Sequence, residues 1–141
     1  MLDLGAGATA FFAILACRFG ARRVFAIEVD DAIAVARQVA AVNGCGERIE
    51  FMQGDSKTIT LPECADIILS DLHGVLPLHD DAIVTLIDAR ARLLAPGGRL
   101  IPARETLWVA GVDAPNLYDI HTGSGTRRGG TSISARHATS R

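Results

Sequence analysis

The sequence predicts an α/β fold with a doubly wound, mostly parallel sheet, and three observations carry this prediction. Short apolar runs alternate with longer helix-like segments along most of the chain. A Gly-x-Gly turn, Gly5 to Gly7, directly follows the first apolar run. Polar residues follow several of the later apolar runs, at the positions where parallel strands would end. Strands and helices that alternate at this spacing are typical of βαβ units.

The first half of the chain is expected to form three strands and two helices. Runs rich in β-branched and aromatic residues predict strands, and apolar residues at helical spacing behind a capping acid predict helices. The expected elements are a strand at Leu2–Leu4, a helix at Thr9–Phe19, a strand at Arg23–Glu28, a helix from Asp30 or Asp31 to Val42, and a strand at Arg48–Met52.

The second half is expected to continue the alternation. Ala65–Ser70 reads as a buried strand, and a loop with Gly74 and Pro77 follows it. The remaining expected elements are a helix opened by Asp80 or Asp81, with Ile83, Ile87 and Leu94 on one side, which ends before Pro96-Gly97-Gly98, then a strand that begins at Arg99–Ile101 and another at Thr106–Val112.

The polar residues at the expected strand ends indicate a nucleoside cofactor. Ligands of open parallel sheets bind outside the carboxyl ends of the strands. Glycines let the backbone approach a ligand, and Glu28, which lies 23 residues after Gly5, could accept ribose hydroxyls. Gly5 to Ala10 also fits the dinucleotide fingerprint, so an NAD-type module stays open at this point, as does a plain turn glycine.

The string Leu-Asp-Leu-Gly-Ala-Gly at residues 2–7 resembles motif I of class I S-adenosylmethionine (SAM)-dependent methyltransferases. The resemblance implies SAM as cofactor, with Asp3 at its methionine end and Glu28 at its ribose. It also implies that Asp55 accepts from the adenine amine, with Ser56 assisting. The candidate cofactor-binding residues are Asp3, Gly5, Ala6, Gly7, Glu28, Val29, Asp55, Ser56 and Ser70.

Residues 67–76, Ile-Ile-Leu-Ser-Asp-Leu-His-Gly-Val-Leu, resemble the Ile-Ile-Ser-Glu-Trp-Met-Gly-Tyr segment of protein arginine methyltransferases. Residues 94–102 and 104–109 resemble later segments of that family, so the similarity spans residues 1 to about 120. It implies that Asp71 and Asp80 grip a substrate guanidinium. His73 would act as a general base if the acceptor were a less basic amine or a hydroxyl. The alternative is that Asp71 is a turn residue and Asp80 a helix cap.

The chain departs from the family pattern at two places. Ala8-Thr9-Ala10 stands where the family has Gly-Thr-Gly, with one extra residue, so we expect weaker cofactor binding. Asp71 and Asp80 stand where the family has glutamates, so the acceptor loop should follow a different path. The chain also starts inside the first expected strand, and we expect a cofactor-binding core truncated at its N-terminus.

Composition and charge favour a packed globular domain and disfavour nucleic-acid-binding, membrane-spanning and secreted proteins. The 141 residues are 49% hydrophobic, which suits one packed domain, expected at residues 1–120. Those residues hold ten basic and sixteen acidic side chains (10 − 16 = −6), so a duplex nucleic-acid footprint is not expected. No apolar run is long enough to cross a membrane, and no signal peptide is evident. Residues 121–141 carry four arginines and no acid, and read as a disordered basic tail.

The sequence therefore predicts a SAM-dependent methyltransferase whose acceptor is a protein arginine guanidinium. The alternatives are a small-molecule N- or O-methyltransferase, and a non-catalytic SAM-binding fragment. Three cysteines without metal-ligand spacing, Cys17, Cys45 and Cys64, favour free thiols and a cytoplasmic location. The expected partner is a protein or small-molecule methyl acceptor, and a longer form of the protein is expected to form a homodimer.

Overall fold

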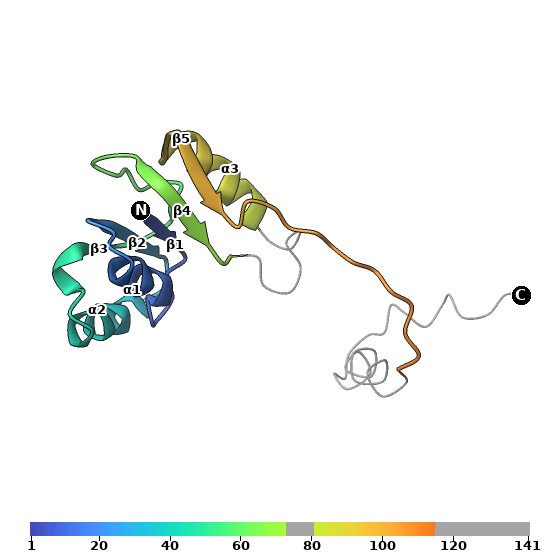
Figure 1. Cartoon of the computed structure of the whole chain (residues 1–141), viewed down its shortest axis with the longest axis horizontal. Helices are drawn as coiled ribbons and strands as arrows, with labels where there is room; N and C mark the ends of the chain where they lie inside the picture. Colours follow the sequence, from blue (N-terminus) through green and yellow to red (C-terminus); the bar gives the residue numbers. More distant parts are fainter. Residues whose placement is uncertain (73–80, 115–141) are drawn as a thin grey trace, which may run out of the picture. The chain divides into compact units, whose positions relative to one another are not determined.

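The computed structural model describes residues 1–72 and 81–114 and contains a five-stranded, all-parallel sheet (Figure 1). The strand order is β3-β2-β1-β4-β5. The strands are β1 (Leu2–Leu4), β2 (Val24–Glu28), β3 (Ile49–Gln53), β4 (Ala65–Ser70) and β5 (Leu94–Ile101). The chain divides into two units, Met1–Thr106 and Leu107–Arg141, and the whole sheet belongs to the first. The predicted fold class is confirmed.

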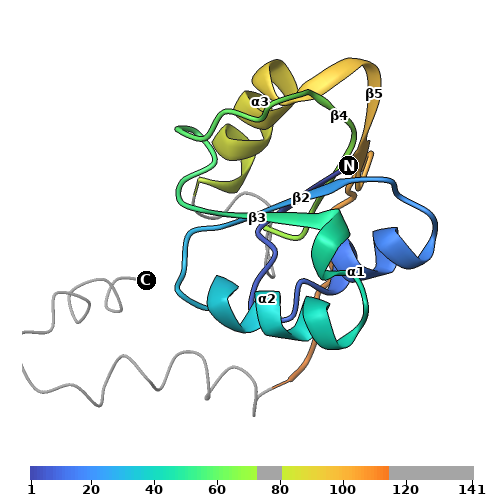
Figure 2. The ribbon, with the colours of Figure 1, turned by 90° about the vertical axis from the view of Figure 1, so that its left-hand side faces the viewer.

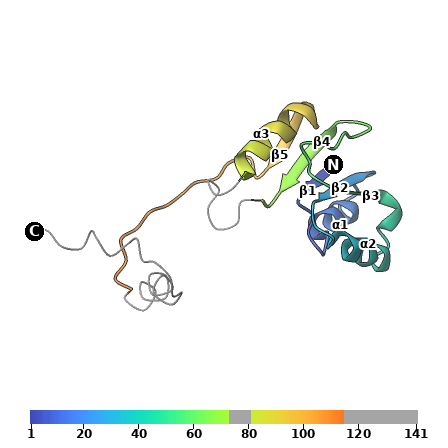
Figure 3. The same ribbon diagram turned by 180° about the vertical axis from the view of Figure 1, so that it is seen from behind.

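Helices lie on both faces of the sheet, as Figures 2 and 3 show from the side and from behind. The helices are α1 (Phe11–Arg18), α2 (Ile33–Val42) and α3 (Ala82–Arg92), with a short 3-10 turn η1 (Gly46–Arg48) before β3. Side chains alternate along β2: Val24 and Ala26 pack in the core under α1 and α2, whereas Phe25 and Ile27 pack in the core that includes α3 residues. Because β2 is buried on both faces, it reads as a continuous apolar run.

The strand order creates a switch point beside β1. The chain proceeds from β1 to β2 and β3 on one side of the sheet, and then crosses back so that β4 pairs with the other side of β1. Leu4, the last residue of β1, is in register with Ile27 of β2 and with Ser70 at the end of β4. The strand ends that carry the predicted polar residues therefore meet at one edge, which is where open α/β sheets bind ligands.

Helix α1 begins at Phe11 rather than at the predicted Thr9, because Ala10 has a left-handed backbone. Its φ of 43° is the single positive value among the described non-glycine residues. The methyl group of Ala10 is fully buried in the core under α1 and α2. The chain thus makes the turn that a glycine would normally make, and accepts a conformation that costs about 1 kcal/mol for an L-residue.

Helix α3 ends earlier than predicted, and the apolar side that Ile83 and Ile87 share is not the buried one. Ile83 and Ile87 are exposed, and Leu94 lies in β5 rather than on the helix. Leu86, Ala89 and Leu93 pack in the core instead, and Ala82 is also buried. This helix has two apolar stripes, and the one that packs inward includes Leu86, Ala89 and Leu93. Helical periodicity alone does not choose between two such stripes.

The predicted strand at Thr106–Val112 is also wrong, because these residues are irregular and without ladder partners among the described residues. Leu107, Trp108 and Val109 are exposed. A β-propensity pattern forms a strand only where a neighbouring strand can pair with it. The tail predicted at residues 121–141 lies outside the described residues. In the described part of the chain, helices are too short and polar to span a membrane.

The core position of Ala36 in α2 is predicted to tolerate no added volume. Ala36 is fully buried in the middle of α2, whereas Ala34 on the same helix is exposed. Ala36→Leu should lower the free energy of unfolding by about 1–3 kcal/mol, because the larger side chain overpacks this core. Ala34→Leu is the matched control and should change stability little. Urea unfolding followed by circular dichroism measures both, and equal midpoints for the two variants would contradict this packing.

Candidate functional site

The turn after β1 requires glycine at both ends, for different reasons. Gly5 has φ +82°, and a Cβ there would lie 2.5 Å from Cδ2 of Leu72. Gly7 has φ +60° and faces open space. The N–H groups of Gly5 and Ala6 both donate to the carbonyl of Ile27, at 2.9 and 3.0 Å. The turn is therefore pinned to β2 on one side, while its Gly7 end stays uncovered.

Asp3 lies behind this turn and caps helix α1. Its side chain is 1% exposed, and its Oδ2 accepts from the N–H of Ala13 at 2.9 Å. Ala10, the residue at the helix N-cap, gives no side-chain hydrogen bond, so Asp3 supplies from β1 the acceptor that the local sequence lacks. Burial raises the pKa of Asp3 from 3.8 to about 6, and the bond from Ala13 opposes that shift. The predicted contact of Asp3 with a cofactor stays a prediction.

Glu28 closes the turn from the other side. Its Oε2 accepts from the N–H of Gly7 at 2.8 Å, and its Oε1 accepts from the N–H of Asp30 at 3.0 Å. A carboxylate offers about four acceptor sites, so about two remain for a ligand. The carboxylate is partly exposed beside the glycine turn, so these acceptor sites are accessible to a ligand.

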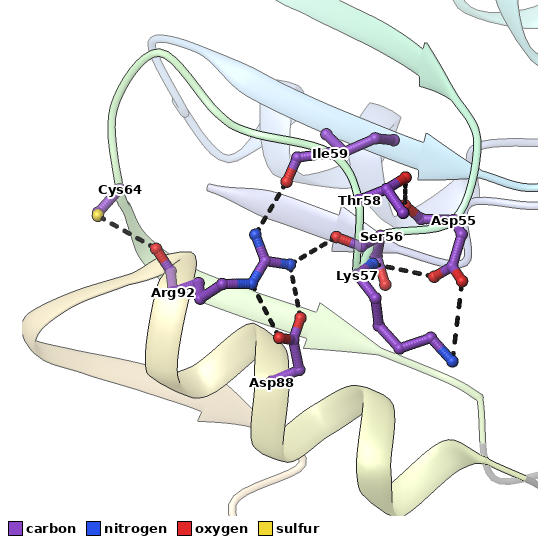
Figure 4. Close-up of polar contacts among 8 residues, drawn as sticks. All are labelled: Asp55, Ser56, Lys57, Thr58, Ile59, Cys64, Asp88 and Arg92. Carbon is purple, nitrogen blue, oxygen red and sulfur yellow. Dashed lines mark hydrogen bonds and ion pairs between the residues drawn. The ribbon is translucent and has the colours of Figure 1, made fainter.

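The segment after β3 forms the next wall. The N–H of Gly54 donates to the carbonyl of Glu28 at 2.9 Å, which ties this segment to β2. Asp55 accepts from the backbone N–H of Lys57 at 2.9 Å, and the Lys57 ammonium lies 3.7 Å from the same carboxylate (Figure 4). Lys57 also lies 3.6 Å from Asp81, at the start of α3. Both ion pairs are exposed and contribute little to stability.

These walls enclose an open cavity of about 310 Å³ at the switch point, a volume near the lower end for small-molecule sites. Apolar side chains from three strand ends form its inner surface, and Glu28, Asp55 and Lys57 provide its charges. The cavity is lined by Leu4, Gly5, Ile27, Glu28, Val29, Gly54, Asp55, Ser56, Lys57, Leu72 and Thr85. Among the described residues, no cluster of histidine, cysteine or acidic side chains could hold a metal ion.

The structure brings most of the predicted cofactor residues to this cavity. Five of them line it: Gly5, Glu28, Val29, Asp55 and Ser56. Asp3, Ala6, Gly7 and Ser70 belong to the same strand ends and turn but are not among the lining residues. The Ser70 hydroxyl is buried at the end of β4 and has no hydrogen-bond partner in the described part of the chain.

The predicted acceptor residues are only partly described. Asp71 is exposed directly after β4. His73 and Asp80 lie outside the described residues. Sequence reasoning missed Leu72, which packs on Gly5, and Arg92, which binds the segment after β3. The one local signal for Arg92 is an acid four residues earlier, Asp88, and such pairs are common on helix surfaces.

The chain is similar in sequence to a methyltransferase family and to protein arginine methyltransferases. Residues 1–98 match the family model described as "Methyltransferase domain". The chain is 34% identical over 113 residues to protein arginine N-methyltransferase 6 of Danio rerio, covering 80% of this chain and 32% of that protein. The chain spans about a third or less of the curated relatives it matches.

Two solved structures have the same fold and about 30% sequence identity to this chain. Protein arginine methyltransferase 10 of Arabidopsis thaliana has a TM-score of 0.67 and 33% identity, covering 71% of this chain and 28% of that one. The Trypanosoma brucei PRMT1 enzyme-prozyme heterotetrameric complex with AdoHcy has a TM-score of 0.64 and 29% identity, covering 70% of this chain and 32% of that one.

The buried Asp3 predicts a specific pH dependence of stability. Its folded-state pKa, about 6, is above the usual 3.8, so the folded state binds this proton more tightly than the unfolded state. The stabilisation from that proton is complete below pH 3.8 and is lost as the pH rises through 6. Asp3→Asn keeps an acceptor for Ala13 without a charge, and should raise the free energy of unfolding at pH 7 by up to about 3 kcal/mol.

The measurement is urea unfolding of both proteins from pH 3 to pH 8. The stability difference between Asp3→Asn and the parent should grow between about pH 4 and pH 6 and then level off. Asp66→Asn, at an exposed position of β4, is the matched control and should show no such growth. A difference for Asp3→Asn that does not change with pH would contradict the burial of a charged Asp3.

Proposed function

We propose that this chain, which belongs to the methyltransferase domain family, carries the SAM-binding core of a protein arginine methyltransferase. Its all-parallel sheet with order β3-β2-β1-β4-β5 is the Rossmann-like fold of its structural neighbours. The relatives named as protein arginine N-methyltransferases support arginine as the acceptor. The observation that carries the proposal is the cavity at the switch point, where a glycine turn, Glu28 and Asp55 meet.

The described residues fit SAM in three respects. Glu28 retains acceptor sites for the ribose hydroxyls beside the uncovered Gly7. Asp55 and the buried Ser56 lie on the cavity wall and would hold the adenine ring and its amine. The unpartnered, buried hydroxyl of Ser70 at the end of β4 offers a further polar contact at the same sheet edge. When bound, SAM supplies a reactive sulfonium methyl group, so the chain mainly has to provide position.

The acceptor would be held by carboxylates. A guanidinium is always protonated and presents planar, forked donors that match carboxylates. Asp71 follows β4 and precedes the cavity-lining Leu72, and it would orient the guanidinium together with Asp80. The role of these residues is to hold one guanidinium nitrogen in line with the methyl group, because correct orientation removes much of the barrier to transfer.

We also propose a cytoplasmic location and, for a longer form of this protein, a homodimer. The free thiols of Cys17, Cys45 and Cys64 support a reducing compartment. The solved Trypanosoma brucei relative is a heterotetrameric complex, which supports assembly in this family. Fluorescence microscopy of the tagged full-length protein tests the location, and light scattering of that protein tests the dimer.

Cofactor binding is predicted to depend on Glu28. The purified chain should bind S-adenosylhomocysteine with a micromolar dissociation constant. Glu28→Gln keeps one acceptor for the Gly7 N–H and loses the charge, so it should weaken binding by about tenfold. Isothermal titration calorimetry measures both values. Glu47→Gln, on the exposed η1 turn, is the control and should bind like the parent. No heat signal for the parent at millimolar ligand would overturn the proposed function.

Methyl transfer is predicted to need Asp71. Radiolabelled SAM should methylate an arginine-rich peptide, and the same peptide with lysine in place of arginine should stay unlabelled. Asp71→Asn should lower the transfer rate by at least about tenfold, because a neutral amide no longer orients the guanidinium. Asp66→Asn at an exposed position of β4 is the control. Equal labelling of both peptides, or transfer to a small amine alone, would overturn arginine as the acceptor.

A further inference from the structure

We propose that Arg92 of α3 is a positioning residue that holds the segment Asp55–Ile59 as a wall of the cofactor cavity. The inference rests on the proposed function, because it concerns the wall that would contact adenine. Arg92 is not among the cavity-lining residues, so it would act through the backbone that it binds.

The guanidinium of Arg92 binds two carbonyls of this segment. Its Nη2 donates to the carbonyl of Ser56 at 2.8 Å, and its Nη1 donates to the carbonyl of Ile59 at 3.0 Å (Figure 4). These carbonyls lie three residues apart on the two sides of a turn in which the N–H groups of Thr58 and Ile59 both donate to the carbonyl of Asp55. One side chain thus spans the turn from end to end.

Asp88 holds the guanidinium in the orientation that this requires. It accepts from Nε of Arg92 at 2.8 Å and from Nη2 at 2.6 Å, one helical turn earlier on α3. The hydrogen bond from Arg92 lowers the pKa of Asp88, so this partner stays ionised at neutral pH. A planar fork with fixed orientation can bind a carboxylate on one edge and carbonyls on the other, which an ammonium cannot do.

Two of the residues that Arg92 binds connect it to the cavity lining. Ser56 lines the cavity directly, and its carbonyl is one of the two that Arg92 binds. The side chain of Ile59 lies 3.6 Å from the Cβ position of Gly54, which is another lining residue. The segment is also held by the Gly54 N–H bond to Glu28, by the packing of Ile59 against the core and by the exposed ion pairs of Lys57.

Helix α3 forms the facing part of the same cavity, because Thr85 also lines it. Thr85 lies two turns before Arg92 on α3. Arg92 therefore links the helix that carries Thr85 to the segment that carries Asp55 and Ser56. This link holds two walls of the cavity at a fixed separation. A ligand that contacts both walls binds well only if that separation stays constant.

The first test needs no ligand and compares Arg92→Gln with Arg90→Gln. Arg90 is exposed on the same helix and makes none of these contacts. Amide hydrogen exchange in the folded proteins should be faster at Thr58 and Ile59 in Arg92→Gln, and unchanged in α1 and α2. Arg92→Lys should also exchange faster there, because one ammonium cannot bind Asp88 and both carbonyls. Parent-like exchange in Arg92→Gln and Arg92→Lys would overturn the proposal.

The second test measures affinity for S-adenosylhomocysteine and for adenosine by calorimetry. Arg92→Gln and Arg92→Lys should bind both ligands about tenfold more weakly, and Arg90→Gln should bind like the parent. Faster exchange with unchanged affinity would overturn the role of Arg92 in the site. If the parent binds neither ligand, the proposed function fails, while the exchange test still decides whether Arg92 holds the segment. If Arg92→Gln does not fold, Arg92→Lys supplies both measurements.

Discussion

Two carboxylates hold the Gly5–Gly7 turn, and the rest of the site depends on this arrangement. Asp3 accepts from Ala13 and so anchors the start of α1 to the end of β1. Glu28 accepts from Gly7 and so anchors the far end of the turn to β2. A turn with left-handed glycines has little intrinsic preference for one shape, and these two bonds, together with those from Gly5 and Ala6 to Ile27, hold it in its observed shape.

The arrangement lowers the stability of the fold near neutral pH. Asp3 is buried close to another acid, Glu28, and burial raises its pKa to about 6, so an ionised Asp3 weakens the fold near neutral pH. Ala10 adds a left-handed backbone at the same place. Its methyl group points into the core rather than into the cavity, since it is fully buried there. The missing glycine therefore strains the turn, but the methyl group of Ala10 does not fill the cavity.

The cavity is formed by elements that are far apart in the sequence. The glycine turn and Glu28 form one side of it, and the segment after β3 and helix α3 form the other. Arg92 joins the last two with side-chain-to-backbone bonds, which replace the ladder bonds that an irregular segment lacks. Leu72 reaches from the end of β4 onto Gly5, so the strand that leads to the predicted acceptor loop also shapes the cofactor side.

The sequence by itself determined the parallel sheet and the edge that carries the site. Apolar runs, helical spacing and polar residues at strand ends are local patterns, and the strand order β3-β2-β1-β4 brings Glu28, Asp55 and Ser70 to one edge. Tertiary structure alone decided which stripe of α3 is buried and whether Thr106–Val112 pairs as a strand. It also decided that Asp3 caps α1 and that Arg92 binds Ser56, 36 residues away. Such contacts depend on how close packed elements lie in space, and local sequence patterns do not determine those distances.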